Sequence, residues 1–303
     1  MIITHSSLEC FNACRRKYKL RYIDGIAPKR SSDALVFGSA MHIALEAYWN
    51  YVKATQTFLT DDSDFGPCNL DFDANKVLTN KIDAAKLTGL LDGYTDKWFR
   101  EDVETYDVIS VEREFKVRRC GNDLTGKVDG IVRNKKTGKY YILEHKTASI
   151  VDESFVAQKQ LDSQTKFYAL MMTGVLGEKI DGAIHDILIK QKIRQKKGEP
   201  DEDFCERLKV DVTADNFQRI QIDFDYDKDI WEDYGNELDG RVTDLWNCRN
   251  FYKCTGSCIG RYGACEYMPL CLRGGLTEDI QGQYEVKRPH EEISEQTIGE
   301  AQQ

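Results

Sequence analysis

The segment KYYILEHK, residues 139–146, places a carboxylate and an ammonium two residues apart, at Glu144 and Lys146. Its tyrosine and isoleucine content is typical of a β-strand. Side chains two residues apart in a strand leave the same face of the sheet. The sequence therefore predicts that Glu144 and Lys146 share one small pocket, which constrains both the fold and the chemistry of the chain.

A second carboxylate is expected beside this pair. Asp129 lies in another strand-like stretch, DLTGKVDGIV, and the turn sequence NKKTGK connects the two stretches. A hairpin at this turn would bring Asp129 and Glu144 together. Two carboxylates beside a lysine suit Mg²⁺, which binds a few protein oxygens and leaves its other positions to water and phosphate.

Each of these features also has a purely structural interpretation. An E-x-K pair on a strand is usually a solvated ion pair that contributes little to stability. A single histidine on an amphipathic helix, such as His42 in MHIALEAYW, is more often a packed side chain than a metal ligand. The combination of these residues in one order is what favours a functional site.

That order resembles the core of the PD-(D/E)XK nucleases, in which an aspartate precedes an E-x-K strand. His42, in G-x-x-x-H-x-x-L-E, is similar to the histidine of the RecB-type branch, and Gln164 and Tyr168 match its Q-x-x-x-Y helix. The resemblance covers about residues 6–271, with Val128 at the place of the family's proline. It implies an α/β fold with a central mixed sheet flanked by helices, a helical insertion, and a C-terminal cysteine-rich cluster loop.

The same resemblance implies the roles of the site residues. The metal, Mg²⁺ or Mn²⁺, would be held by the following group: His42, Asp129, Glu144 and His145. His145 would contribute only its backbone carbonyl, because its side chain should leave the opposite face of the strand. Lys146 would lie near the attacking water, and Gln164 and Tyr168 would complete the catalytic set from one face of a helix. An imidazole ligand shifts the preference toward Mn²⁺.

Cysteines form a second group of candidate ligands. The chain has ten, and five of them crowd into residues 248–271. No signal peptide or membrane-length apolar run is recognised, so we expect a cytoplasmic protein of a bacterium or a phage-infected host. Clustered thiols there more often bind metal than form disulfides. One interpretation is a structural Zn²⁺ site formed by four cysteines: Cys254, Cys258, Cys265 and Cys271.

The start of the chain, SSLECFNACRRKYKLRYIDGI, resembles the opening of iron–sulfur nucleases related to AddB and to the CRISPR adaptation nucleases. This resemblance implies a [4Fe–4S] cluster with four ligands: Cys14, Cys258, Cys265 and Cys271. Cys10 and Cys254 compete for places in this set. Such a cluster would close a ring of about 240 residues, so its expected role is structural.

The pattern along the chain predicts one nuclease domain over residues 1–272 and a polar, poorly ordered tail over residues 273–303. The domain would consist of four parts: an N-terminal cluster and DNA segment (1–30), a helical region (38–108) interrupted by the acidic loop TDDSDFGP, the nuclease core (108–225), and a helix with the cysteine-rich loop (226–272). In the core we expect one helix over residues 154–177 and a strand over residues 180–190. The strand-like segments RLKVDVT and FQRIQIDFDY follow.

The net charge of −9 is unusual for a nucleic-acid-binding protein, so the distribution of charge matters more than its sum. Basic residues alternate with aromatic ones near the N-terminus, and four of them are predicted to contact nucleic acid: Arg15, Arg16, Lys17 and Tyr18. A second basic segment spans residues 190–197. It either contacts a strand or forms a solvated hairpin tip that the acidic stretch EPDEDFCE compensates.

No G-x-x-x-x-G-K-[ST] phosphate loop occurs, so a helicase activity is not expected in this chain. The resemblance implies a free-standing, phage-type DNA exonuclease that prefers single-stranded ends and acts in recombination, repair or replication. A helicase or a single-strand annealing protein would be its partner. Two alternatives remain: a double-strand-end resection nuclease working with an annealing protein, and a zinc- or cluster-stabilised DNA-binding module without catalysis.

Overall fold

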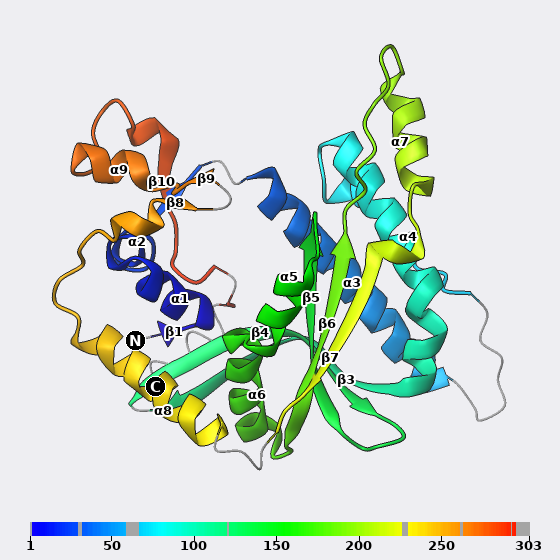
Figure 1. The fold of residues 1–303 in the computed structure, drawn as a ribbon, viewed down its shortest axis with the longest axis horizontal. Coiled ribbons are helices and arrows are strands. Elements are labelled where there is room, and N and C mark those ends of the chain that lie inside the picture. The colour runs from blue at the N-terminus through cyan, green and yellow to red at the C-terminus, as the bar shows by residue number, and fades with distance from the viewer. Residues whose placement is uncertain are drawn as a thin grey trace. The chain divides into compact units, whose positions relative to one another are not determined.

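The computed structural model describes residues 2–29, 32–58, 67–119, 121–225, 230–260, 263–291 and 293–294 (Figure 1). The chain divides into two compact units. We call the first the terminal unit; it combines the segments Met1–Ser31, Glu114–Lys127 and Asp225–Gln303. The second, the sheet unit, combines Ser32–Arg113 and Val128–Phe224. None of the described helices combines the length and the apolar composition needed to cross a membrane.

The strands form a mixed sheet with the order β1-β4-β5-β6-β7, and β3 pairs with β4. Their bounds are β1 (Ile2–Ile3), β3 (Tyr106–Arg119), β4 (Asn122–Asn134), β5 (Tyr140–Ala148), β6 (Ile180–Ile189) and β7 (Phe217–Asp223). The pairs β4–β5 and β6–β7 are antiparallel, and β5–β6 is parallel. The predicted mixed sheet and the order of its core strands are therefore confirmed.

The turn between β4 and β5 forms where the NKKTGK sequence predicts it. The Asn134 side-chain oxygen accepts hydrogen bonds from the backbone N–H groups of Lys136 and Thr137, both at 3.0 Å. Gly138 has a φ of 71°, which a residue without a Cβ adopts readily. The turn sets the register in which Gly130 lies opposite Leu143, so Asp129 and Glu144 follow as neighbours on adjacent strands.

Helices of the sheet unit flank these strands. They are α3 (Asp33–Phe58), α4 (Lys81–Thr105), α5 (Glu153–Gln160), α6 (Ser163–Leu176) and α7 (Asp201–Val210), with short 3₁₀ turns at Ala74–Lys76 and Ala214–Asn216. The helical region expected over residues 38–108 is thus α3 and α4. The acidic loop TDDSDFGP, residues 60–67, lies outside the described residues except for its last position.

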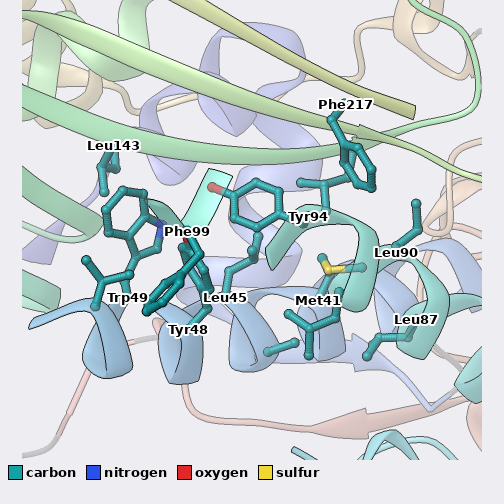
Figure 2. Packing of buried hydrophobic residues seen from close by; sticks show 14 of the residues in the cluster. Met41, Leu45, Tyr48, Trp49, Leu87, Leu90, Tyr94, Phe99, Leu143 and Phe217 are labelled. Carbon is teal, nitrogen blue, oxygen red and sulfur yellow. The ribbon is translucent and has the colours of Figure 1, made fainter. Parts of the chain in front are cut away.

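The core of the sheet unit lies between α3, α4 and the strands (Figure 2). Tyr48 and Trp49 of α3, Tyr94 of α4 and Leu143 of β5 are all buried there. Complete burial of one large apolar side chain stabilises a fold by about 1.5–3 kcal/mol. This packing fixes α3, and with it His42, against the strand that carries Glu144.

Two predicted elements differ from the structure. The single helix expected over residues 154–177 is broken, because the Asp162 side chain accepts a hydrogen bond from the N–H of Gln164 and caps a new helix, α6.

The segment RLKVDVT does not form the expected strand, because its first four residues form the last turn of α7. Phe204 and Leu208, one helical turn apart, are buried together against Ala85, so helical periodicity prevails over the β-branched residues that follow.

The terminal unit is mostly helical and ends in short strands. It contains α1 (His5–Ala13), α2 (Arg15–Tyr18), a π-helical turn (Lys19–Ile23), β2 (Ile26–Pro28), α8 (Ile230–Asn247), a 3₁₀ turn (Thr255–Ser257), β8 (Ile259–Gly260), β9 (Gly263–Ala264), α9 (Met268–Arg273), a second 3₁₀ turn (Gln281–Gln283) and β10 (Tyr284–Val286). The expected helix before the cysteine-rich loop is α8.

Residues 273–291 pack against the start of the chain, although their polar composition predicts a poorly ordered tail; residues 295–303 lie outside the described residues. β10 pairs with β2 in an antiparallel ladder, with Tyr284 opposite Pro28. Ile280 and Tyr284 are buried with Leu20 and Tyr267, and the Tyr284 hydroxyl donates to the backbone oxygen of Glu266 at 2.7 Å. Two apolar residues in an otherwise polar segment are enough to fasten it to the start of the chain.

Candidate active site and cysteine group

Glu144 and Lys146 share one face of β5, as their spacing predicts. The Glu144 carboxylate is only 1% exposed and forms an ion pair with the Lys146 ammonium. Burial raises the pKa of Glu144 to about 7, and the positive charge of Lys146 offsets only part of this effect. Glu144 therefore lies in a pocket where added positive charge would be favourable.

Gln164 and Tyr168 face this pair from α6. The Gln164 side-chain oxygen accepts from Lys146 Nζ at 3.4 Å, and its nitrogen donates to Glu144 Oε2 at 3.4 Å and to the Tyr168 hydroxyl at 3.2 Å. The cap at Asp162 places Gln164 in the first turn of the helix, at the level of β5. The four residues therefore form one hydrogen-bonded group.

Asp129 forms the second part of the site with residues of α3 and β5. His42 Nδ1 lies 3.4 Å from Asp129 Oδ1, and the backbone N–H of His145 donates to Asp129 Oδ2 at 2.8 Å. Burial opposes the charge of Asp129, but the hydrogen bond and charge of His42 outweigh it and lower the pKa of Asp129 to about 2. For the same reason the pKa of His42 is raised although burial lowers it. The contact between His42 and Asp129 thus favours the charged form of each side chain.

His145 is closer to this group than the alternation of a strand predicts. One possible ligand atom from each of His42, Asp129 and His145 lies within 4.8 Å of the others. His145 Nδ1 is 3.6 Å from Asp129 Oδ2, beyond hydrogen-bond distance. The ring is 2% exposed, so it is a buried neighbour of the site.

Trp49 determines which nitrogen of His145 carries the proton. Its indole N–H donates to His145 Nε2 at 3.0 Å, and an indole nitrogen can only donate. A neutral imidazole that accepts at Nε2 carries its proton at Nδ1, the nitrogen that faces Asp129. In this tautomer neither ring nitrogen of His145 has a free lone pair for a metal, and the backbone role expected for this residue stays a prediction.

A buried ionic network lies behind His145, and the sequence reasoning missed it. The Arg219 guanidinium of β7 bonds Asp186 of β6 at 2.6 and 3.0 Å and also pairs with Asp102 of α4. Asp186 Oδ2 lies 3.9 Å from His145 Nε2. The available signal was the alternation in FQRIQID, which places Arg219 on the same face as the buried Phe217.

The donors fit a divalent cation, although they are not gathered around one point. Asp129 and Glu144 supply carboxylate oxygens and His42 supplies a nitrogen, a set that suits Mg²⁺ or Mn²⁺. The Glu144 carboxylate, however, is turned toward Lys146 and Gln164 and is not part of the group within 4.8 Å. This buried carboxylate and the Asp129 carboxylate together give the site its capacity for a cation.

The cysteines of the terminal unit meet around Cys14, which precedes α2. The Cys14 sulfur accepts a hydrogen bond from the N–H of Cys254 at 3.5 Å. Burial raises the pKa of Cys14, but this contact and those with the N–H groups of Lys17 and Arg16 hold it below its usual value. The charges of Cys265 and Cys271 interact with that of Cys14, whereas burial raises the pKa of Cys10 to about 11. Cys14 is thus the better candidate ligand at the N-terminus.

The spacing of the sulfurs does not match a preformed zinc site. A tetrahedral ion with Zn–S bonds of about 2.3 Å needs sulfurs about 3.8 Å apart. Among the described residues, no three cysteine sulfurs lie within 4.8 Å of one another. Cations surround the group instead, since Lys17 and Arg16 act on Cys265 and Cys271, and Lys253 Nζ donates to the backbone oxygen of Cys271 at 2.6 Å.

The predicted nucleic-acid contacts at residues 15–18 need one correction. The Tyr18 ring is 3% exposed and packs edge-on against Phe11 with centroids 5.5 Å apart, so it is a core residue and is not available for base stacking. Arg15 lies over the rings of Phe11 and Tyr252, 5.0 Å from each centroid. Lys17 forms an ion pair with Glu266 at 3.1 Å.

The chain is similar to one family of known proteins over most of its length. No curated protein matches the sequence. Solved structures similar to the chain include a candidate exonuclease from Eubacterium rectale (13% identity, TM-score 0.42, covering 98% of this chain and 92% of that one) and SSO0001 (10% identity, TM-score 0.28, covering 74% and 82%). The family model described as PD-(D/E)XK nuclease superfamily matches residues 2–271, which include Asp129, Glu144 and Lys146. The chain therefore belongs to the PD-(D/E)XK nuclease superfamily.

Proposed function

We propose that the chain is a metal-dependent DNA exonuclease that hydrolyses phosphodiester bonds and prefers single-stranded ends. One observation carries the proposal: the buried Glu144 carboxylate contacts Lys146 and Gln164 and lies on the strand next to Asp129. A carboxylate that burial leaves with a pKa of about 7 gains much from a divalent cation, because the cation replaces the solvation that the carboxylate has lost.

The proposed roles follow from the contacts. Asp129 and Glu144 hold the cation through carboxylate oxygens, His42 through its imidazole, and His145 through its backbone carbonyl. A bound Mg²⁺ or Mn²⁺ would polarise the scissile phosphate and lower the pKa of a coordinated water. Lys146 places its ammonium beside the negative charge that develops on the phosphate.

Gln164 and Tyr168 keep this arrangement in place. Gln164 accepts from Lys146 and donates to Glu144, so it fixes the orientation of both charged groups at once. The Tyr168 hydroxyl in turn accepts from Gln164. Groups of this kind orient ligands and reacting side chains without touching the metal.

We propose further that Cys14, Cys258, Cys265 and Cys271 bind a [4Fe–4S] cluster. The choice of a cluster over a single structural Zn²⁺ rests on the resemblance, and the lowered pKa of Cys14 and the cations that act on Cys271 suit thiolates that bind metal. Such a cluster would cross-link the two ends of the chain. We leave Cys254 outside the set on the resemblance alone, because both its backbone N–H and its thiol contact Cys14.

The preference for ends rests on the resemblance to iron–sulfur nucleases that degrade single strands. Arg15, Arg16 and Lys17 would contact phosphates of the strand, and a helicase or a single-strand annealing protein in the cytoplasm would deliver it. This role belongs to recombination, repair or replication.

Linear and circular single-stranded DNA test the proposal. The anaerobically purified protein with Mg²⁺ or Mn²⁺ should degrade an end-labelled linear strand and leave a closed circle of the same sequence intact. Lys146→Ala should cleave neither. Cleavage of the circle at the rate of the linear strand would contradict the exonuclease assignment, and resistance of both would contradict the nuclease assignment.

A further inference from the structure

The segment from Lys190 to Lys197, which we call the basic arm, carries five cations in eight residues. It follows β6 directly and leads to α7, and Figure 1 shows α7 and this connection as a projection of the sheet unit. Four of its cations are exposed and form no ion pair within the part of the chain that the structure describes: Lys192, Arg194, Lys196 and Lys197.

The arm is fastened along its inner side. The Gln191 amide is buried and donates to the backbone oxygens of Lys86 and Leu208 at 3.1 and 3.2 Å. Ile193 packs against the buried cluster that contains Phe204. Because Gln191 and Ile193 point inward, Lys192 and Arg194 between and after them point outward, about 6.6 Å apart if the segment is extended.

Two acidic residues near the arm, Glu199 and Asp201, have hydrogen-bond partners of their own. Glu199 accepts two bonds from Arg207, at 2.7 and 2.8 Å, and one from the backbone N–H of Lys196 at 2.7 Å. Asp201 accepts from Gln195 at 2.7 Å. Within the described residues, none of these carboxylates lies at ion-pair distance from Lys192, Arg194, Lys196 or Lys197, so the four cations remain available to an external anion.

The base of the arm lies at the catalytic end of the sheet. The N–H of Lys190 donates to the backbone oxygen of Ala148 at 2.9 Å, two residues after Lys146. The Lys190 ammonium lies 4.1 Å from the ring centroid of Phe37, which precedes His42 on α3. Seven residues of extended chain reach at most about 25 Å, so the tip at Lys197 stays within that distance of the base.

We propose that the basic arm binds the sugar-phosphate backbone of the nucleic-acid substrate several nucleotides away from the scissile bond. The inference rests on the proposed nuclease function and extends it to a second contact with the same substrate. A row of fixed, solvent-facing cations complements a polymer with regularly repeated negative charge, and its affinity comes from counterion release. The arm would thus hold the strand while its end occupies the site at Glu144.

Two variants of equal charge test the arm. Lys192→Gln/Lys196→Gln/Lys197→Gln removes three of its cations, and Lys136→Gln/Lys139→Gln/Lys179→Gln removes three lysines at the opposite end of the same sheet. Binding of a 30-nucleotide single strand is measured in EDTA, without cleavage, at several salt concentrations. Each lost phosphate contact lowers the slope of log K against log salt by about 0.7, so the arm variant should lose about 2 from the slope. The control variant should keep the wild-type slope.

Cleavage of long and short strands separates binding from catalysis. A dinucleotide, whose single phosphodiester occupies the site at Glu144, should be hydrolysed equally by the wild type and the arm variant. The inference is overturned if the arm variant keeps the wild-type salt slope, or if the control variant loses as much. If no form of the protein cleaves DNA but the arm variant alone loses salt dependence, the proposed nuclease function fails and the arm remains a nucleic-acid contact.

Discussion

Trp49→Phe tests whether the tautomer of His145 supports the metal site. The substitution keeps an aromatic ring between α3 and β5 but removes the indole N–H that donates to His145 Nε2 at 3.0 Å. Both side chains are almost fully buried, so no water replaces the lost donor. His145 is then free to move its proton to Nε2 and to turn an unprotonated Nδ1 toward the Asp129 carboxylate, 3.6 Å away.

The expected magnitudes follow from these contacts. An unpaired buried acceptor costs about 1–3 kcal/mol, so the free energy of unfolding should fall by about that amount in a urea titration. Loss of a group that orients a ligand typically weakens metal binding 10–100-fold. We therefore expect the Mn²⁺ affinity measured by calorimetry to fall by at least about 10-fold in Trp49→Phe.

Tyr48→Phe is the matched control. It removes one buried hydrogen bond, which the Tyr48 hydroxyl donates to Asp102 at 2.7 Å. Tyr48 directly precedes Trp49 on α3. Tyr48→Phe should also lower the free energy of unfolding, while its Mn²⁺ affinity should stay within about 2-fold of the wild type. Equal Mn²⁺ affinities in the two variants would refute the role assigned to Trp49.

Three further outcomes are expected. Arg219→Met leaves two buried carboxylates without their cation and should lower the free energy of unfolding by about 3–5 kcal/mol in urea titrations; a loss below 1 kcal/mol would mean that the network is not buried. Cys14→Ser should abolish iron and sulfide binding in anaerobic preparations, whereas Cys254→Ser, which keeps the backbone N–H, should bind both; equal losses would change the ligand set. Ile280→Ala should destabilise the terminal unit by about 2–5 kcal/mol and raise amide exchange in β2, and unchanged exchange would show that the C-terminal segment does not pack there.

Local patterns predicted the parts of the site that lie close together in sequence. The spacing of Glu144 and Lys146 predicted that both lie on one face of a strand. The turn at NKKTGK predicted that Asp129 lies on the adjacent strand, near Glu144. Gln164 and Tyr168, one helical turn apart, face the same pair. In each case a period of two or of about 3.6 residues determines the outcome, and such periods can be read directly from a sequence.

Contacts that join distant elements could not be predicted in this way. The bond from Trp49 to His145 spans 96 positions and that from Arg219 to Asp102 spans 117. No short pattern signals either bond, because the partners meet only after the helices pack on the sheet. The order of the segment around Ile280 could not be predicted for a related reason. Its few apolar residues are stabilised by β2, which lies far away in the sequence.

Cleavage of end-labelled single-stranded DNA by the wild type and by Glu144→Gln tests the central claim most directly. The substitution preserves the size of the side chain and removes the negative charge that the proposed site uses for its cation. In Mg²⁺ or Mn²⁺ the wild type should cleave the strand, and Glu144→Gln should be slower by at least about 100-fold, while its DNA binding in EDTA stays unchanged. Cleavage by Glu144→Gln at the wild-type rate would contradict the assignment of this site.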